Sequence, residues 1–452
     1  MGKPAAKRVA GAVAAAAIVV AGTWGAGTLL RRLRQQRDGV GTIPLPVLPD
    51  APDRARQRGP FSAQIGLFSL LAPGTGRIRV DVPWDDDWFF QDPRVYNPDL
   101  ARACAALAFV AVSESYHFKS RGGDPADMEN ALAALGFTDC RTHSYQYRSR
   151  PVDEVLGALT DTVDVAAYAM ARKDLAPRPG ERPTTVLLVA VRGSYGSEWI
   201  SNVKLPADLA EERAEQTEAD LWTLEGVDHT GFERAAREIL RDLVDYATGL
   251  RDRDVKLVLC GHSRGGSIAN YVAGHVVRLA RSPFSVCRRE NVYCYTVAAP
   301  TVTSRPDAQG PAFRGIFNLC NPNDPVPRLP LFKWGYRRYG RDVLLPGYGD
   351  EGFDARFRAM ASYFELTIGV PVPYRPSDRE TVNRFVASLD ERIPTRRAWS
   401  SPVNKLYFGA RLLTLANPAQ LFASHYESVY LSWLQTLRTD GLTFLPPGEP
   451  LR

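Results

Sequence analysis

The chain has 452 residues, of which 45% are hydrophobic and 23% are charged. These values are ordinary for a globular protein, and the length allows one large domain with additions or two modest domains. The formal net charge is +6, but residues 1–40 hold seven basic side chains and one acidic side chain, which accounts for the whole excess. A neutral body argues against a nucleic-acid-binding protein, whereas a basic N-terminus fits an anchor that faces anionic lipid.

The N-terminal region contains 22 consecutive uncharged residues, at positions 9–30. A helix of this length can span a hydrocarbon core, and the flanking basic residues suit either a cleaved signal peptide or a retained anchor. Arg31 and Arg32 follow the apolar run directly and disfavour cleavage, so we expect residues 1–38 to form a single membrane-spanning anchor. Secretion after cleavage is the alternative. Basic residues flank both sides about equally, so they do not orient the anchor.

The region after the anchor divides into a linker and a folded body. Five prolines with scattered charge make residues 39–60 an extended linker, and residues 61–452 form the body. Residues 61–71 are apolar and are expected to pack on the body or on the membrane surface. Residues 85–87 are consecutive aspartates, which cannot easily converge on one metal ion, so we expect a solvated loop there.

Strands alternate with helices along the body. Asn97, Pro98 and Asp99 make a good helix start, with a capping residue, a proline and an acid in the first turn. Further helices are predicted at 124–136, 232–250 and 266–278, and strands at 142–148, 163–172, 184–192, 255–260, 292–298 and 316–319. This alternation predicts an α/β fold with a mostly parallel, doubly wound sheet.

The central motif is a strand, a tight turn and a helix. The apolar strand at 255–260 runs directly into the sequence GHSRG at 261–265. This is the arrangement of a nucleophile elbow, in which glycine is needed two residues before and after the serine because larger side chains would clash. Gly261 and Gly265 fill these two places. Ser263 is therefore the candidate nucleophile, although a plain glycine-rich turn could show the same five residues.

A serine nucleophile needs a histidine base that a carboxylate orients, and in this arrangement the chain order is serine, acid, histidine. Three of the six histidines lie well before Ser263, at positions 117, 143 and 229. His262 lies on a turn that points its side chain away from the serine, and His275 lies three turns along the next helix. His425, at the start of an apolar helix, is the candidate base. A histidine merely packed on aromatic residues at a helix start is the alternative.

Asp324 is the candidate acid. It follows the strand at 316–319 in a proline-rich loop, and sites gather at the carboxyl ends of strands in open α/β sheets. An ordinary Asp-Pro turn is the alternative, and the other acids that could serve are Asp342, Asp350 and Asp354.

Two backbone N–H groups are candidates for an oxyanion hole. One belongs to Ser194, which follows Gly193 at the end of the strand at 184–192, and its hydroxyl could also donate. The other belongs to Arg264, directly after the nucleophile.

The six cysteines show no C-x-x-C pair and no spacing that suits a metal site. We expect them to be buried small side chains, although Cys287 and Cys294 could pair if the domain lies outside the cytoplasm. No metal is predicted.

Taken in order, several short motifs resemble those of the class 3 lipases, the fungal-lipase-like branch of the α/β-hydrolases. They are the oxyanion strand at 189–194, a tryptophan-containing segment at 198–202, His-x-Gly-Phe at 229–232, the elbow at 261–266, a strand end at 296–300, the acid loop at 323–327 and His425. The resemblance covers about residues 184–329 and the C-terminal helix. It implies an α/β-hydrolase fold, a Ser-Asp-His triad, a lid containing Trp199, hydrolysis of glycerolipid-type esters, and neither a cofactor nor a catalytic metal.

The chain departs from this family in three places. Arg264 stands where leucine is commoner, which changes the pocket wall. The long interval between Asp324 and His425 requires an insertion at about 331–424, with a helix near 378–390. The segment at 198–202 is polar, which argues against ordinary interfacial activation.

The sequence thus predicts a membrane-associated serine esterase or lipase with a lipid ester as substrate and no nucleic-acid partner. An acyltransferase would use the same residues, with an alcohol in place of water. The alternative outside enzymes is a catalytically silent α/β-hydrolase that serves as a membrane-associated binding module. Such a module would not need the three side chains to converge. The oligomeric state is not predicted.

Overall fold

The computed structural model of the chain describes residues 41–44, 58–120, 127–143, 167–193, 230–399, 401, 403–404, 407–408, 411 and 418–451. The predicted anchor at 1–38 and most of the linker at 39–60 lie outside these ranges. No helix within them is long and apolar enough to cross a membrane.

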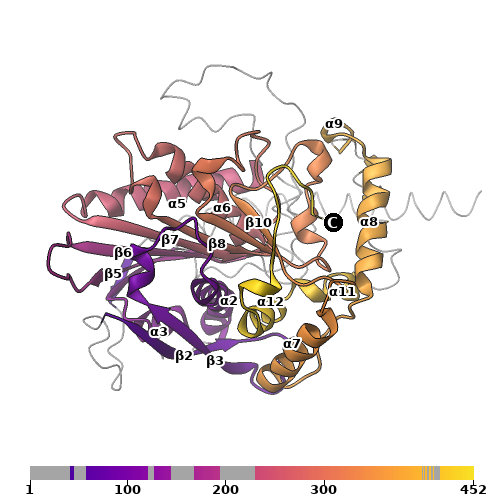
Figure 1. Cartoon of the computed structure of the whole chain (residues 1–452), viewed down its shortest axis with the longest axis horizontal. Coiled ribbons are helices and arrows are strands. Elements are labelled where there is room, and N and C mark those ends of the chain that lie inside the picture. The colour runs from indigo at the N-terminus through magenta and orange to yellow at the C-terminus, as the bar shows by residue number, and fades with distance from the viewer. Residues whose placement is uncertain are drawn as a thin grey trace, which may run out of the picture.

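A sheet of nine strands runs through the described part of the chain (Figure 1), in the order β1-β4-β5-β6-β7-β8-β9-β10-β11. The strands are β1 (Gly41–Pro44), β4 (Asp139–His143), β5 (Tyr168–Leu175), β6 (Thr184–Val191), β7 (Asp254–His262), β8 (Val292–Val297), β9 (Ile316–Cys320), β10 (Arg341–Leu344) and β11 (Thr443–Phe444). Strands β6 to β10 are parallel to one another, and the pairs at both margins are antiparallel. The predicted α/β fold with a mostly parallel sheet is confirmed, and the strands β1, β10 and β11 are additions to the predicted strands.

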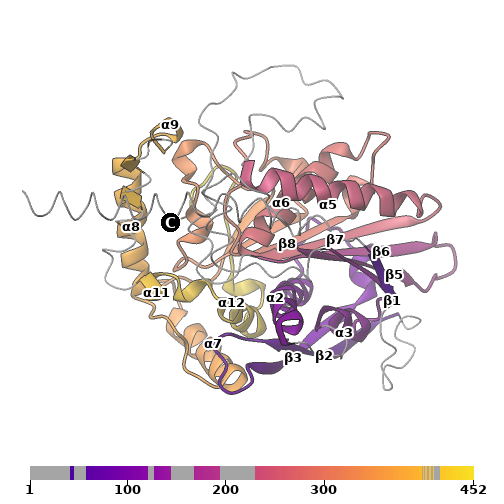
Figure 2. The same cartoon turned by 180° about the vertical axis from the view of Figure 1, so that it is seen from behind.

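Helices cover both faces of this sheet (Figure 1, Figure 2). The helices α5 (Thr230–Thr248) and α6 (Ser263–Leu279) lie on one face, and α2 (Pro98–Ser120) and α12 (Glu427–Thr436) lie on the other. In β6, Leu188 belongs to the core beneath α2, and its neighbour Leu187 belongs to the core beneath α5. Side chains alternate across a strand, so a strand buried on both faces is apolar throughout.

A separate two-stranded antiparallel sheet, β2 (Pro60–Phe68) and β3 (Arg77–Asp85), packs against α2 and α3 (Asp127–Ala134). Alternate residues of both strands are buried, as expected for a sheet with one solvated face. The apolar segment at 61–71 therefore packs on the body, which is one of the two predicted alternatives.

The expectation of a solvated loop at 85–87 is wrong for Asp86. This residue is only 1% exposed, and its carboxylate lies 2.9 Å from Nζ of the buried Lys173. The indole N–H of Trp84 also donates to Asp86, at 2.8 Å. The partner cation lies on β5, far along the chain, so the local sequence gives no sign of the pair.

The predicted insertion at 331–424 is joined to the rest of the body. β10 lies beside β9 in the main sheet, and α7 (Phe353–Ile368) shares a core with α12. The helix α8 (Asp378–Arg392) agrees with the one predicted near 378–390 and forms a further core with the loop after β9. The remaining short helices are α9 (Arg396–Trp399), α11 (Pro418–Leu421), and the 3-10 turns η1 (Asp86–Phe90), η4 (Arg289–Asn291), η5 (Pro311–Phe313), η6 (Val326–Arg328), η7 (Phe332–Trp334), η8 (Ala423–His425) and η9 (Thr439–Gly441).

Candidate active site

Ser263 lies at the turn between β7 and α6, and its backbone is in the left-handed region, with a φ of 55°. A residue with a side chain is strained there and keeps this conformation only where the surrounding structure holds it. A Cβ atom on Gly265 would lie 2.4 Å from the carbonyl oxygen of Val191, and one on Gly261 would lie 2.4 Å from the carbonyl oxygen of Gly265. Both elbow glycines are therefore required by the backbone packed against them.

The structure brings the three predicted triad side chains together. His425 Nε2 lies 2.9 Å from Ser263 Oγ, and His425 Nδ1 lies 2.7 Å from Asp324 Oδ2. The carboxylate accepts from Nδ1–H, and this leaves the lone pair of Nε2 directed at the serine. That tautomer is the one a general base needs in order to take the serine proton.

The Asp324 side chain is fully buried and has further donors. The backbone N–H of Val326 donates to Oδ1 at 2.9 Å, and the hydroxyl of Tyr430 donates to Oδ2 at 2.8 Å. Burial, and then the charge of Asp324, hold the pKa of Tyr430 well above its ordinary value, so the hydroxyl stays a donor. These hydrogen bonds stabilise a charge that burial alone would disfavour.

A second histidine lies beside the base. His262 Nε2 is 2.8 Å from the backbone carbonyl oxygen of His425, and His262 Nδ1 is 3.2 Å from Oε1 of Glu427. The sequence analysis set His262 aside because the elbow turn points it away from Ser263. Its ring instead faces the backbone of the base.

Sequence reasoning did not identify Glu427 or Tyr430. Both lie on α12, which was predicted only as an apolar helix. A carboxylate two residues after the base, in a helix that is otherwise largely buried, was the available signal for Glu427. Nothing local distinguishes Tyr430 from the aromatic residues around it.

The loop after β6 passes directly beside the elbow. A Cβ atom on Gly193 would lie 2.7 Å from the carbonyl oxygen of His262, so the approach depends on glycine. Ser194 and Trp199, the predicted oxyanion donor and lid residue, lie outside the described residues. Arg264 occupies the first turn of α6, where the positive end of the helix dipole favours a negative charge.

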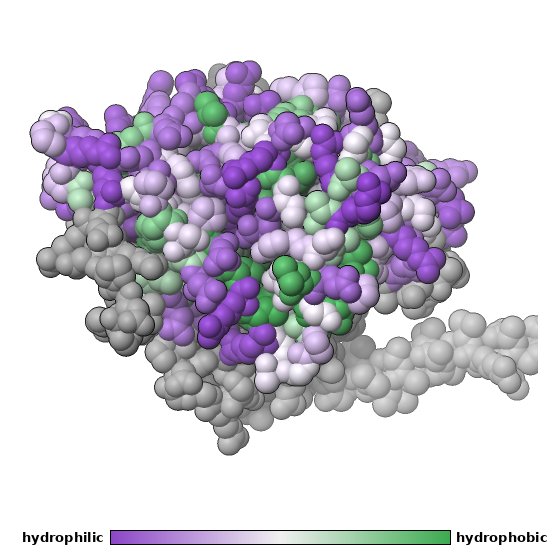
Figure 3. Space-filling model, turned by 60° about the horizontal axis from the view of Figure 1, so that its bottom comes forward, coloured by the Kyte–Doolittle hydropathy of each residue, from purple (hydrophilic) through white to green (hydrophobic). Residues whose placement is uncertain are grey.

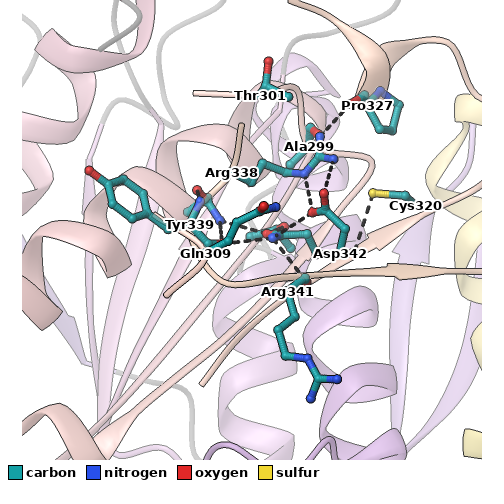
Figure 4. A network of polar contacts seen from close by, with 12 residues as sticks. Ala299, Thr301, Gln309, Cys320, Pro327, Arg338, Tyr339, Arg341 and Asp342 are labelled. Carbon is teal, nitrogen blue, oxygen red and sulfur yellow. Dashed lines mark hydrogen bonds and ion pairs between the residues drawn. The ribbon is translucent and has the colours of Figure 1, made fainter. Parts of the chain in front are cut away.

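A buried ion pair holds two loops of the carboxyl edge together, as Figure 4 shows. Arg338 donates to the two carboxylate oxygens of Asp342 at 2.7 and 2.9 Å, to the carbonyl of Ala299 at 2.8 Å and to that of Pro327 at 2.6 Å. Ala299 follows β8 and Pro327 lies at the end of the acid loop, so one guanidinium binds both loops. Burial by itself lowers the pKa of Arg338, but the charge and hydrogen bonding of Asp342, together with the nearby Cys320 and Tyr430, outweigh burial and raise it. Asp342, one of the other candidate acids, is thus bound to Arg338.

The remaining candidate acids and His275 lie outside the Ser263–His425–Asp324 series. The carboxylate of Asp350 accepts from the backbone N–H of Gly347 at 2.7 Å, and Asp354 lies in the first turn of α7. His275 is buried on α6, with its ring centre 4.3 Å from that of Tyr271.

All six cysteines are buried and free, as expected, and Cys287 and Cys294 do not form the disulfide considered as an alternative. In the part of the chain that the structure describes, no group of three or more histidine, cysteine, aspartate or glutamate side chains could hold a metal ion.

Part of the chain is similar to a known protein family. Residues 188–334 match the family Lipase (class 3). The chain is 27% identical over 208 residues to the Secreted mono- and diacylglycerol lipase 1 of Fusarium solani, which covers 43% of this chain and 51% of the relative. It is 24% identical over 197 residues to the chloroplastic Galactolipase DONGLE of Arabidopsis thaliana, which covers 40% of this chain and 41% of the relative. The chain thus spans about half the length of these curated relatives or less.

Solved structures of lipases are also similar to this chain. The native propeptide complex of the Rhizomucor miehei lipase is 18% identical, with a TM-score of 0.35, and the match covers 56% of this chain and 70% of that one. The mono- and diacylglycerol lipase of Aspergillus oryzae is 20% identical, with a TM-score of 0.34, and the match covers 57% and 81%. Residues 188–334, which match the class 3 lipase family, contain the nucleophile elbow and the acid loop, so the similarity to that family lies over these two parts of the site.

Proposed function

We propose that the chain is a serine carboxyl-ester hydrolase, a lipase that acts on glycerolipid-type esters. The observation that carries the proposal is the continuous hydrogen-bonded series from Ser263 Oγ through the His425 ring to the Asp324 carboxylate, with contacts of 2.9 and 2.7 Å. Nucleophile, base and orienting acid stand in the order and geometry of a serine hydrolase triad.

The proposed reaction has two halves. Ser263 Oγ attacks the ester carbonyl carbon while His425 Nε2 takes the hydroxyl proton. Asp324 stabilises the imidazolium that forms, and the proton then passes to the leaving alcohol as the carbon–oxygen bond breaks. Water, deprotonated by the same nitrogen, attacks the acyl-enzyme, and collapse of the second tetrahedral intermediate releases the acid and restores Ser263.

We assign the oxyanion hole to the backbone N–H groups of Arg264 and Ser194. The position of Arg264 in the first turn of α6 and the close approach of Gly193 to the elbow support this assignment. Donors placed before the reaction starts stabilise the developing negative charge without reorganisation. Trp199 is assigned to a lid segment by the family resemblance.

Two relatives bear on the substrate class. One is named a mono- and diacylglycerol lipase and the other a galactolipase. Both names denote hydrolysis of acyl esters of a glycerol backbone, and the two differ in the group at the remaining position. We therefore propose glycerolipid acyl esters as the substrate class.

The primary test is labelling with a fluorophosphonate, wild type beside Ser263→Ala, with Ser267→Ala as the matched control. Ser267 lies on the same helix, and its hydroxyl donates to the carbonyl of Pro300 at 3.0 Å. Label on the wild type and on the control, but not on Ser263→Ala, is the expected result. Absence of label on a folded wild type would favour the silent binding module. Product analysis on a panel of glycerolipid esters, with and without an added alcohol, separates hydrolysis from acyl transfer.

We also propose that residues 1–38 anchor a lipase body at 61–452 to a membrane. The support is the sequence alone: 22 uncharged residues flanked by basic ones. The alternative is secretion after cleavage, and one relative is named a secreted lipase. Mass spectrometry of the mature N-terminus, together with membrane fractionation, decides between them. An intact N-terminus in the membrane fraction supports the anchor, and a processed chain in the medium supports secretion.

A further inference from the structure

We propose that His262 and Glu427 form a second histidine–carboxylate pair that positions the base, His425, through its backbone carbonyl. This inference rests on the proposed function, since it concerns the residue that acts there as general base. The two residues act through His425 and are positioning residues.

The atoms around the His262 ring determine its protonation. A carbonyl oxygen can only accept, so Nε2, which lies 2.8 Å from the carbonyl oxygen of His425, must carry a hydrogen. The other ring nitrogen, Nδ1, faces the carboxylate of Glu427 at 3.2 Å. A bare lone pair would repel the carboxylate, so a proton has to lie between the two groups. The N–H···O alignment falls short of a good hydrogen bond, so the contact acts chiefly through charge.

The surroundings favour the charged form of this pair. The His262 side chain is 3% exposed and that of Glu427 is 15% exposed. Burial lowers the pKa of His262, but the charge and hydrogen bonding of Glu427, together with the carbonyl of His425 and the charge of Asp324, outweigh burial and raise it. Burial raises the pKa of Glu427, but the charge and hydrogen bonding of His262, together with a backbone hydrogen bond and the charge of His425, outweigh burial and lower it. The ionisable groups that face His262 are Glu427 and Tyr430 from α12, His425 from η8 and Asp324 from the acid loop.

Two contacts fix the short segment that carries the base. Ser424 Oγ donates to the backbone carbonyl of Asn323 at 2.8 Å, which ties the segment to the acid loop. His262 Nε2–H donates to the carbonyl of His425, which ties the segment to the elbow. The segment that carries His425 is thus bound both to the acid loop and to the elbow.

The carboxylate of Glu427 has a second effect. The rings of His262 and His425 are centred 4.8 Å apart. An uncompensated imidazolium at His262 would oppose the second imidazolium that forms on His425 during attack. The carboxylate cancels that charge, so the carbonyl of the base is held by a strong, charge-assisted donor without a net charge beside the reacting ring.

The test compares Glu427→Gln, Glu427→Asp and Ser424→Ala with the wild type, all as the full chain. The ring ¹⁵N and ¹H shifts of His262 are followed by NMR across pH, and kcat and KM are measured on a soluble ester. We expect the wild-type His262 ring to stay doubly protonated at pH 7. In Glu427→Gln we expect the ring to lose its second proton at lower pH, and kcat to fall about 10- to 100-fold with KM nearly unchanged.

The other two variants separate charge from anchoring. Relative to Glu427→Gln, Glu427→Asp should restore part of kcat and part of the second protonation of the His262 ring. Ser424→Ala should lower kcat but leave the titration of His262 as in the wild type. A singly protonated His262 in the wild type at pH 7 overturns the proposal. So does a Glu427→Gln variant that loses only thermal stability while kcat and the titration stay unchanged. Failure of the proposed function is distinguishable, because a wild type that neither labels nor hydrolyses esters leaves the His262 titration measurable.

Discussion

Tyr430 and His425 bind the same oxygen of the candidate acid. The Tyr430 hydroxyl donates to Asp324 Oδ2 at 2.8 Å, and His425 Nδ1 lies 2.7 Å from that oxygen. The Tyr430 hydroxyl also accepts from the backbone N–H of Asn321 at 2.9 Å. One hydroxyl therefore fixes both the charge and the loop position of the acid.

Replacement of Tyr430 with phenylalanine should remove one of the donors to a buried carboxylate and leave the N–H of Asn321 without its acceptor. We expect the free energy of unfolding to fall by about 1–3 kcal/mol and kcat/KM to fall about tenfold. Urea unfolding and ester hydrolysis measure the two effects. Ser432→Ala is the control, because that hydroxyl donates only within α12, to the carbonyl of Ser428. Equal activity of Tyr430→Phe and the control would show that the hydroxyl does not support the acid.

Gly265→Ala should destroy the elbow. The added Cβ would lie 2.4 Å from the carbonyl oxygen of Val191 and 2.5 Å from the carbonyl carbon of Arg192, so the backbone of either β6 or α6 has to move. We expect loss of fluorophosphonate labelling and a loss of stability of about 1–3 kcal/mol. Gly249→Ala is the matched control, since its nearest neighbour would lie at 3.7 Å. Normal labelling of Gly265→Ala would contradict the close packing described for the turn.

Removing one partner of the Arg338–Asp342 ion pair should lower the stability of the fold more than removing both partners together. Arg338→Met leaves a buried carboxylate without its cation, at a cost of about 3–5 kcal/mol. Arg338→Met combined with Asp342→Leu should recover much of the stability, because no isolated charge is left. Thermal and urea unfolding measure both variants.

The exposed pair of Arg94 and Asp92 supplies the comparison for that experiment. Its side chains are 65% and 41% exposed, so Arg94→Met should leave the free energy of unfolding close to that of the wild type. An equally small change for Arg338→Met would mean that the buried guanidinium does not hold the two loops.

Stability should fall in acid partly through Asp254. Burial raises the pKa of this carboxyl, but hydrogen bonding and charge from Lys256, with help from Asn291 and Arg288, outweigh burial and lower it. A lowered folded-state pKa contributes stability that is complete above the unfolded value of about 3.9 and is lost as pH falls through the folded value. Asp254→Asn should flatten this part of the pH–stability curve, measured by urea unfolding between pH 2 and 6. Asp252→Asn, at an exposed neighbouring position, is the control.

The elbow serine, the candidate acid and the candidate base could each be proposed from the sequence, for different reasons. The glycines two residues before and after Ser263 identify it as the candidate nucleophile, because the tight turn requires glycine at those two positions. Asp324 follows a strand end, and His425 was reached by elimination among six histidines. These arguments need only chain order and strand polarity.

What escaped prediction depends on contacts between distant parts of the chain. Asp86 looked like a loop aspartate because its partner Lys173 lies on another strand. The sequence indicated only that the His262 side chain points away from Ser263. Its neighbours in the structure, His425 and Glu427, lie far along the chain. The pairing of polar side chains in a core is set by how the elements pack, and local pattern carries no information about it.

The separation of the site along the chain has a consequence for synthesis. The nucleophile and the base are 162 positions apart, and α12 follows the base with the tyrosine that supports the acid. A ribosome therefore releases the strand, the elbow and the acid loop well before the base exists. On this arrangement Ser263 has no histidine beside it until residue 425 has been made and α12 has docked, so the proposed triad cannot assemble before that stage of synthesis.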